Sequence, residues 1–143
     1  MATIGNILGE RTGNIIRVGP SESVQHALKV MAQYNVGAVL VMEHGRLLGI
    51  VTERDYARKV VLKGKLSETT QVRDIMSTRV ICATPQMSLE GAMAVTAENN
   101  IRHLPVVDDA KEVLGVISIR DLVGEIINEQ KFVINQLEHY IAG

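Results

Sequence analysis

Two seven-residue segments of this 143-residue chain carry the same types of side chain at six of their seven positions. Residues 49–55 and 115–121 each run from a glycine through two apolar residues to a hydroxyl residue, and each ends on Arg-Asp. Each segment lies where a predicted strand gives way to a predicted helix. The N-terminus of a helix favours an anion, because its backbone N–H groups are free and its dipole is positive there. A carboxylate at that place accepts hydrogen bonds from ribose hydroxyls, while a hydroxyl and an Arg bind phosphate oxygens. The segments therefore predict a nucleotide site.

The same residues also have a purely structural interpretation. Thr52 with Asp55, and Ser118 with Asp121, have the spacing of a helix capping box, in which the two side chains satisfy backbone N–H groups. Capping and ligand binding are compatible. Capping alone does not require the Arg that precedes the Asp in both copies. Arg54 and Arg120 are therefore the residues that favour a ligand site.

The two segments belong to a longer internal repeat. Residues 23–42 match residues 88–107 at an offset of 65, and a turn that is one residue longer in the second copy makes the offset 66 thereafter. Apolar residues at helical spacing, followed by two apolar runs around a turn, predict a βαββα order in each copy. The predicted strands are residues 16–18, 38–42 and 47–51 in the first copy, and 80–82, 104–107 and 113–117 in the second. A unit of about 60 residues is marginal alone, so we expect the two copies to pack together.

Composition excludes several classes of protein. The formal net charge is −1, and the chain has no Trp and one Phe, which argues against a nucleic-acid partner. No apolar run approaches the ~20 residues of a membrane span, and the first residues lack a secretory signal, so we expect a cytoplasmic protein without a membrane. The single Cys82 is expected to be an unreactive core thiol. No catalytic or metal-binding motif is present, and the four histidines fall on unrelated predicted elements, so neither catalysis nor a metal is expected.

The doubled motif, together with residues 101–108 (IRHLPVVD) and 72–76 (VRDIM), resembles a CBS-domain pair, or Bateman module, over residues 3–129. The resemblance implies an α/β (α+β) fold of two tandem βαββα repeats related by pseudo-two-fold symmetry, with small mixed sheets packed with helices. Residues 1–143 would form one module. Within it we expect a first repeat over 10–62, a linker over 63–71, a second repeat over 72–130 and a C-terminal helix extension over 131–143.

The resemblance also implies two clefts between the repeats that take an adenine nucleotide, such as AMP, ATP or NAD(H), or S-adenosylmethionine, as a regulatory ligand. In such a cleft the Asp binds the ribose. The second copy has cationic residues where the first has small ones, so we expect the clefts to be unequal. By position, one cleft would combine Ser118, Arg120 and Asp121 with Val36, Gly37 and Ala38, and the other Thr52, Arg54 and Asp55 with Ile101, Arg102 and His103.

The function expected from these features is that of a sensor module for signal transduction. Ligand binding would change the arrangement of the module, and an unidentified regulated protein would respond in trans. The final predicted helix continues an apolar face beyond the repeat, through Val133, Ile134, Leu137 and Ile141. This face packs either on its own chain or on a second subunit, and we expect a homodimer to cover it. The alternative is a ligand-independent module for protein interaction or dimerisation.

Overall fold

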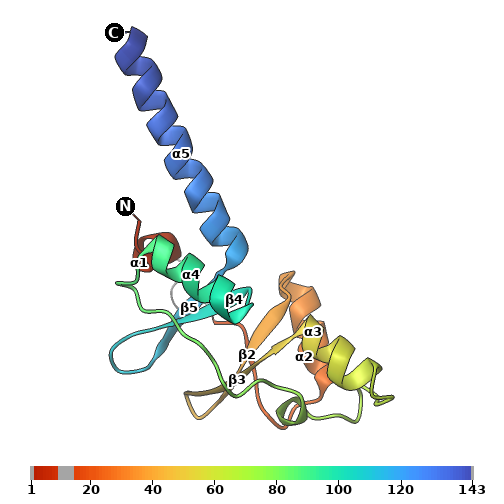
Figure 1. The fold of residues 1–143 in the computed structure, drawn as a ribbon. Helices are drawn as coiled ribbons and strands as arrows, with labels where there is room; N and C mark the ends of the chain where they lie inside the picture. Colours follow the sequence, from red (N-terminus) through yellow and green to blue (C-terminus); the bar gives the residue numbers. More distant parts are fainter. Residues whose placement is uncertain (1, 10–14, 143) are drawn as a thin grey trace. The chain divides into compact units, whose positions relative to one another are not determined.

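A computed structural model describes residues 2–9 and 15–142 of the chain (Figure 1). The chain divides into two compact units. The first, Asn14–Ile81, holds the body of the first repeat and is called the repeat-1 unit. The second combines Met1–Gly13 with Cys82–Gly143 and is called the repeat-2 unit.

The repeat-1 unit is built on a three-stranded mixed sheet. Strand β2 (Ala38–Glu43) lies between β1 (Arg17–Val18), which runs parallel to it, and β3 (Arg46–Thr52), which runs antiparallel. The helical elements are α2 (Val24–Tyr34), α3 (Glu53–Tyr56), the π-helical η2 (Ala57–Val61) and the 3-10 helix η3 (Val72–Asp74). The core packs these helices against the strands through Val18, Val24, Ala27, Met31, Val39, Val41, Val51, Val60, Val72 and Ile75.

Helix α2 follows the sequence prediction closely. The Ser23 side chain caps its start by accepting from the N–H of His26, and Asn35 ends it in the left-handed conformation. Val24, Ala27 and Met31 are buried on one face, as their spacing predicted. The turn between β2 and β3 contains His44 and Gly45, both with positive φ, which suits a tight hairpin.

The repeat-2 unit has a two-stranded antiparallel sheet, formed by β4 (His103–Val107) and β5 (Val113–Ser118). Its helices are α1 (Ile4–Leu8), α4 (Leu89–Asn99) and the 24-residue α5 (Ile119–Ala142). Helix α4 repeats the caps of α2, since Ser88 accepts from the N–H of Gly91 and Asn100 is left-handed. The local sequence signals therefore give the same helix twice.

The leading segments of the two repeats are exchanged between the units. Helix α1 precedes the first repeat in sequence but packs in the repeat-2 unit, where the N–H of Ile4 donates to Met87. The corresponding η3 segment begins the second repeat but packs in the repeat-1 unit, where the N–H of Val72 donates to Glu22. The glycine of each motif permits this packing. A Cβ on Gly49 would lie 2.7 Å from the carbonyl oxygen of Ser77, and a Cβ on Gly115 would lie 2.7 Å from Cδ1 of Leu8.

One predicted strand was wrong. Residues 80–82 do not form a strand, and only Ala83 makes an isolated parallel bridge, with Val106. In the repeat-1 unit the Leu40 N–H donates to Ile16 and extends the ladder. The equivalent of Leu40 is Pro105, which has no N–H to donate, so the ladder ends after the two bonds made by Ala83.

The predicted linker, residues 63–71, is bonded to the first turn of α2. Its carbonyls on Thr70 and Ser67 accept from the N–H groups of Val24 and Gln25, at 2.8 and 3.0 Å. The buried Thr70 hydroxyl donates to Leu66 at 2.7 Å. The segment therefore belongs to the repeat-1 unit, and the division between the units falls after Ile81. No helix in the described ranges is long and apolar enough to cross a membrane.

Candidate nucleotide-binding site

In the repeat-1 unit the motif forms a complete capping box at the end of β3. The Thr52 hydroxyl accepts from the N–H of Asp55 at 3.1 Å, and Oδ2 of Asp55 accepts from both the N–H and the hydroxyl of Thr52, at 3.0 and 3.1 Å. The other oxygen, Oδ1, lies 3.1 Å from the Lys59 ammonium, one turn further along. The Asp55 side chain is only 16% exposed. Much of the capacity of this carboxylate to accept hydrogen bonds is thus used within the unit.

The start of β2 lies directly beside this cap. Ala38 pairs with Thr52 across the sheet, and the Glu53 N–H donates to the carbonyl of Gly37 at 3.0 Å. The Glu53 carboxylate covers Gly37, since a Cβ on that glycine would lie 3.0 Å from Oε1. Val36 precedes these residues and is half-buried. An acidic side chain therefore stands where a larger residue at position 37 would project.

The repeat-2 unit builds the same cap at the start of α5. The Ser118 hydroxyl accepts from the N–H of Asp121 at 3.2 Å, and Oδ2 of Asp121 accepts from the N–H and hydroxyl of Ser118, at 2.9 and 3.1 Å. The residue one turn further along is Glu125, which cannot form the ion pair that Lys59 forms in the first copy. The backbone geometry is repeated, but the electrostatic surroundings of the two carboxylates differ.

Cationic and titratable groups surround the second cap. His103 pairs with Ser118, and the Ile119 N–H donates to the carbonyl of Arg102 at 2.9 Å. Burial is the main cause that lowers the pKa of His103. The neighbouring Arg102 lowers this pKa further, whereas Asp121 opposes the shift. Arg102 and Arg120 are exposed, so their guanidinium groups are accessible to an anion. Ile101 precedes them and is half-buried.

The structure thus brings the predicted site residues together within each unit. One group contains Val36, Gly37, Ala38, Thr52, Arg54 and Asp55, and the other contains Ile101, Arg102, His103, Ser118, Arg120 and Asp121. The grouping across the two repeats stays a prediction. Sequence reasoning missed Lys59 and Glu53. The i,i+4 spacing of Asp55 and Lys59 on a helix was the available signal for the ion pair.

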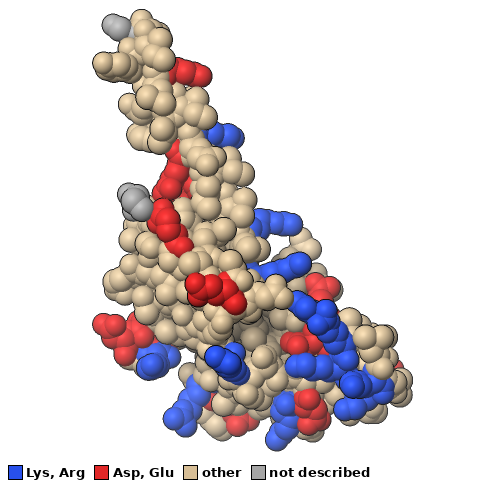
Figure 2. Space-filling view, viewed as in Figure 1, with Lys and Arg blue, Asp and Glu red and all other residues tan. Residues whose placement is uncertain are grey.

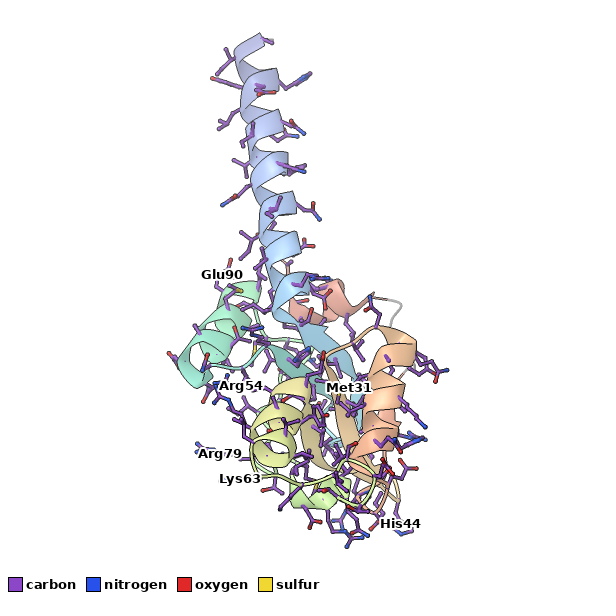
Figure 3. The ribbon with its side chains drawn as sticks, turned by 90° about the vertical axis from the view of Figure 1, so that its right-hand side faces the viewer. Met31, His44, Arg54, Lys63, Arg79 and Glu90 are labelled. Carbon is purple, nitrogen blue, oxygen red and sulfur yellow. The ribbon has the colours of Figure 1, made fainter. Side chains whose placement is uncertain are left out.

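Charge is also distributed unequally over larger distances. Residues 14–81 contain ten Lys and Arg against six Asp and Glu, whereas the rest of the chain contains five against ten. Figure 2 shows basic side chains gathered over the repeat-1 unit and acidic ones along α5. Arg54, Lys63 and Arg79 lie along one side of the repeat-1 unit (Figure 3). The near-zero net charge of the chain is therefore the sum of a basic repeat-1 unit and an acidic repeat-2 unit.

The remaining chemical groups do not form a second centre. Among the described residues, no three His, Cys, Asp or Glu side chains are grouped as metal ligands. Cys82 is half-buried, and burial raises the pKa of its thiol, against a smaller opposing effect of Lys111. A raised pKa disfavours the reactive thiolate, which supports the interpretation of Cys82 as a packing residue.

Residues 5–62 and 72–128 each match the family model of the CBS domain. The chain belongs to the CBS-domain family. The CBS-domain-containing protein CBSX3 of Arabidopsis thaliana, described as mitochondrial, is 40% identical over 127 residues, which cover 85% of this chain and 61% of that protein. The structure of a CBS-domain protein from Burkholderia ambifaria MC40-6 superimposes with a TM-score of 0.86 at 41% identity, covering 90% of this chain and 96% of that one. The resemblance and the fold of two tandem CBS repeats are thus confirmed.

A third CBS relative carries a ligand. The crystal structure of CBSX2 in complex with AMP matches with a TM-score of 0.74 at 25% identity, and it covers 91% of this chain and 99% of that one. The CBS pair is a regulatory, not a catalytic, module. The chain spans 61% of the length of the CBSX3 relative, so the match describes a module and not the whole of that protein.

Proposed function

We propose that this CBS pair is a sensor that binds an adenine nucleotide and regulates a partner protein in trans. The observation that carries the proposal is the doubled cap. In both units a hydroxyl and an Asp are locked together at a helix N-terminus, an exposed Arg stands beside them, and the start of a strand borders the site. Capping accounts for the hydroxyl and one carboxylate oxygen, but not for the Arg. The AMP complex of CBSX2 supports the choice of ligand class.

The cap prepares the Asp for a ribose. Because Oδ2 is held by two hydrogen bonds from Thr52 or Ser118, the carboxylate is fixed in orientation before a ligand arrives. In the repeat-1 unit a ribose competes with Lys59 for Oδ1 of Asp55. In the repeat-2 unit the corresponding position is Glu125, which cannot form the ion pair that Lys59 forms.

The charges beside the two caps favour binding of the phosphate in the repeat-2 unit. Arg102 and Arg120 flank the N-terminus of α5, which itself favours an anion. In the repeat-1 unit the Glu53 carboxylate occupies the matching place over Gly37 and repels a phosphate. The net charges of the two units would favour the opposite assignment, because the repeat-1 unit is the more basic one. Salt screens charges beyond about 8 to 10 Å, however, so the side chains next to each cap determine where the phosphate binds. The repeat-1 unit suits an adenosyl ligand with a neutral or cationic substituent.

Binding is tested by isothermal titration calorimetry of the full chain with AMP, ATP, NAD and S-adenosylmethionine. At least one of these ligands is expected to bind, and the double variant Asp55→Ala/Asp121→Ala should bind none. Each Asp contributes a charge-assisted hydrogen bond worth about 1.5 to 3 kcal/mol, or roughly tenfold to hundredfold in affinity. Absence of binding to all four by the wild-type chain would contradict the proposal and favour a ligand-independent interaction module.

Regulation requires the ligand to bind one arrangement of the chain more tightly than another. We expect small-angle scattering profiles with and without saturating AMP to differ. Identical profiles, with calorimetry showing that the ligand is bound, would count against a sensor whose output is a change of arrangement.

A further inference from the structure

The C-terminal half of α5 has an apolar face that no described residue of its own unit covers. The family match ends at residue 128, and α5 continues to Ala142 beyond the hairpin and helices of the repeat-2 unit (Figure 1). Every residue from 130 to 142 is exposed. Six large apolar side chains in this stretch are more than half exposed, namely Phe132, Val133, Ile134, Leu137, Tyr140 and Ile141.

The spacing of the exposed apolar residues is that of a helix that pairs with another helix. Positions 123, 127, 130, 134, 137 and 141 alternate steps of four and three residues, and all but Gln130 are apolar. Val133 and Tyr140 widen this stripe on one side. A stripe of this kind supports interlocking packing between helices. Phe132 lies on the opposite face of α5, at the angle that 100° per residue gives it.

A groove adjoins this stripe. It has a volume of about 700 Å³ and lies between α4 and α5 within the repeat-2 unit. Its apolar walls come from Leu89 and Met93 on α4 and from Ile126, Val133 and Ile134 on α5. Hydrophobic grooves beside helices commonly accept the apolar face of another amphipathic helix.

The charges on the flank of the stripe identify the occupant and its direction. Lys131 and Glu138 lie two turns apart on the same flank of α5. An antiparallel second copy of α5 brings Lys131 of each chain against Glu138 of the other, so the arrangement forms two opposite-charge contacts. In a parallel arrangement, the flank with Lys131 and Glu138 of one copy would instead face the apolar flank with Val133 and Tyr140 of the other. The charge pattern is therefore complementary to itself only in the antiparallel direction.

We infer that residues 127–141 of the stripe, together with the groove, bind α5 of a second copy of this chain in antiparallel orientation, around a two-fold axis near residue 134. In this arrangement Leu137, Tyr140 and Ile141 of one copy reach the groove of the other. The contact is isologous, because each copy offers the same stripe and receives the same stripe. It does not depend on nucleotide, so it is tested without ligand, and its outcome is separate from that of the binding experiments.

Sedimentation equilibrium of the full chain without ligand, over about 1 to 100 µM, tests the contact. The wild type should be a dimer, and Leu137→Glu should raise the dimer dissociation constant at least about hundredfold. Phe132→Glu is the matched control, because Phe132 is 64% exposed and Leu137 57% exposed on opposite faces of the same helix. It should leave the dissociation constant unchanged. A monomeric wild type, or an equal effect of both variants, would overturn the inference.

Charge exchange gives a second test that does not disturb the apolar stripe. Lys131→Glu and Glu138→Lys should each raise the dissociation constant severalfold, because like charges then meet. The double variant Lys131→Glu/Glu138→Lys should restore it, and an equimolar mixture of the two single variants should form heterodimers in preference to homodimers. Failure of both the double variant and the mixture to recover affinity would overturn the antiparallel arrangement.

Discussion

In the repeat-1 unit Gly37 and Ala38 border the cap beneath the carboxylate of Glu53, whereas in the repeat-2 unit Arg102 and His103 border it beside Ile119. The hydrogen bonds of the two caps agree atom for atom, including the double acceptance by Oδ2. Duplication has therefore kept the backbone and the cap while changing the charges around them. Under the proposed function, the cap marks where a ligand binds and the neighbouring side chains determine which ligand it is.

The largest expected difference between the units concerns stability. Gly49→Ala places a Cβ against the backbone carbonyl of Ser77, which cannot move without breaking its bonds to Ile50. Gly115→Ala places a Cβ against Cδ1 of Leu8, the end of a side chain that can rotate. We expect losses in the free energy of unfolding of about 3 kcal/mol for Gly49→Ala and about 1 kcal/mol for Gly115→Ala. Urea denaturation measures both. Equal losses in the free energy of unfolding would show that the Leu8 side chain yields no more readily to an added Cβ than the Ser77 carbonyl does.

A reciprocal exchange of charge should move the preference for phosphate. Glu53→Gln removes the carboxylate over Gly37, and we expect AMP to bind the repeat-1 unit roughly threefold to tenfold more tightly. Ile119→Glu introduces a carboxylate at the matching position of the repeat-2 unit and should weaken AMP binding there by a similar factor. Calorimetry with adenosine is the control, because its affinity should change less than that of AMP. Equal changes in the affinities for AMP and adenosine would show that the charge at position 53 does not determine phosphate binding.

The pH dependence of stability should distinguish the two units through His103. Burial and Arg102 lower its pKa in the folded chain, so the unfolded chain takes up a proton first as the pH falls. The free energy of unfolding should therefore decrease as the pH drops below about 6.5, the ordinary pKa of histidine. His103→Gln should lose less stability than the wild type between pH 7 and pH 5.5 in urea denaturation. A parallel decline of the two proteins would contradict this assignment.

The smallest expected effect comes from the Lys59–Asp55 ion pair of the first copy. Lys59→Met removes the contact to Asp55 and the hydrogen bond to Ile75, while it keeps the apolar stem. Because the Lys59 side chain is 45% exposed, we expect a stability loss of less than about 1 kcal/mol. The affinity of the repeat-1 unit for adenosine should rise slightly, since Oδ1 of Asp55 is released. A fall in adenosine affinity would mean that Lys59 contacts the ligand.

Local features of the fold could be predicted from the sequence, whereas features that depend on a partner segment could not. The caps at Ser23 and Ser88 and the buried stripe of α2 each follow from residues within one or two turns. The missing strand at residues 80–82 depends on Pro105, which lies on a different segment. The repeat pattern likewise does not determine in which unit α1 and η3 pack, because that depends on tertiary contacts.

The exposure of the side chains in η2 could not be predicted from the sequence either. In a regular helix Val60 and Val61 would both lie on the apolar face. The π-turn over Ala57–Val61 places more residues in each turn, so Val60 is buried and Val61 is 53% exposed. At the candidate site, the sequence identified the Thr52–Asp55 and Ser118–Asp121 pairs. It did not reveal that Glu53 covers Gly37, because that contact requires the end of β3 and the start of β2 to meet.

The central claim is that the two caps are both ligand sites but are not equivalent. Calorimetric titration of AMP into the wild type, Asp55→Ala and Asp121→Ala tests it most directly. The account predicts that Asp121→Ala weakens the tighter binding event roughly tenfold to hundredfold, and that Asp55→Ala leaves its affinity unchanged. Unchanged AMP binding in both folded variants would contradict the account and return both Asp residues to helix capping alone.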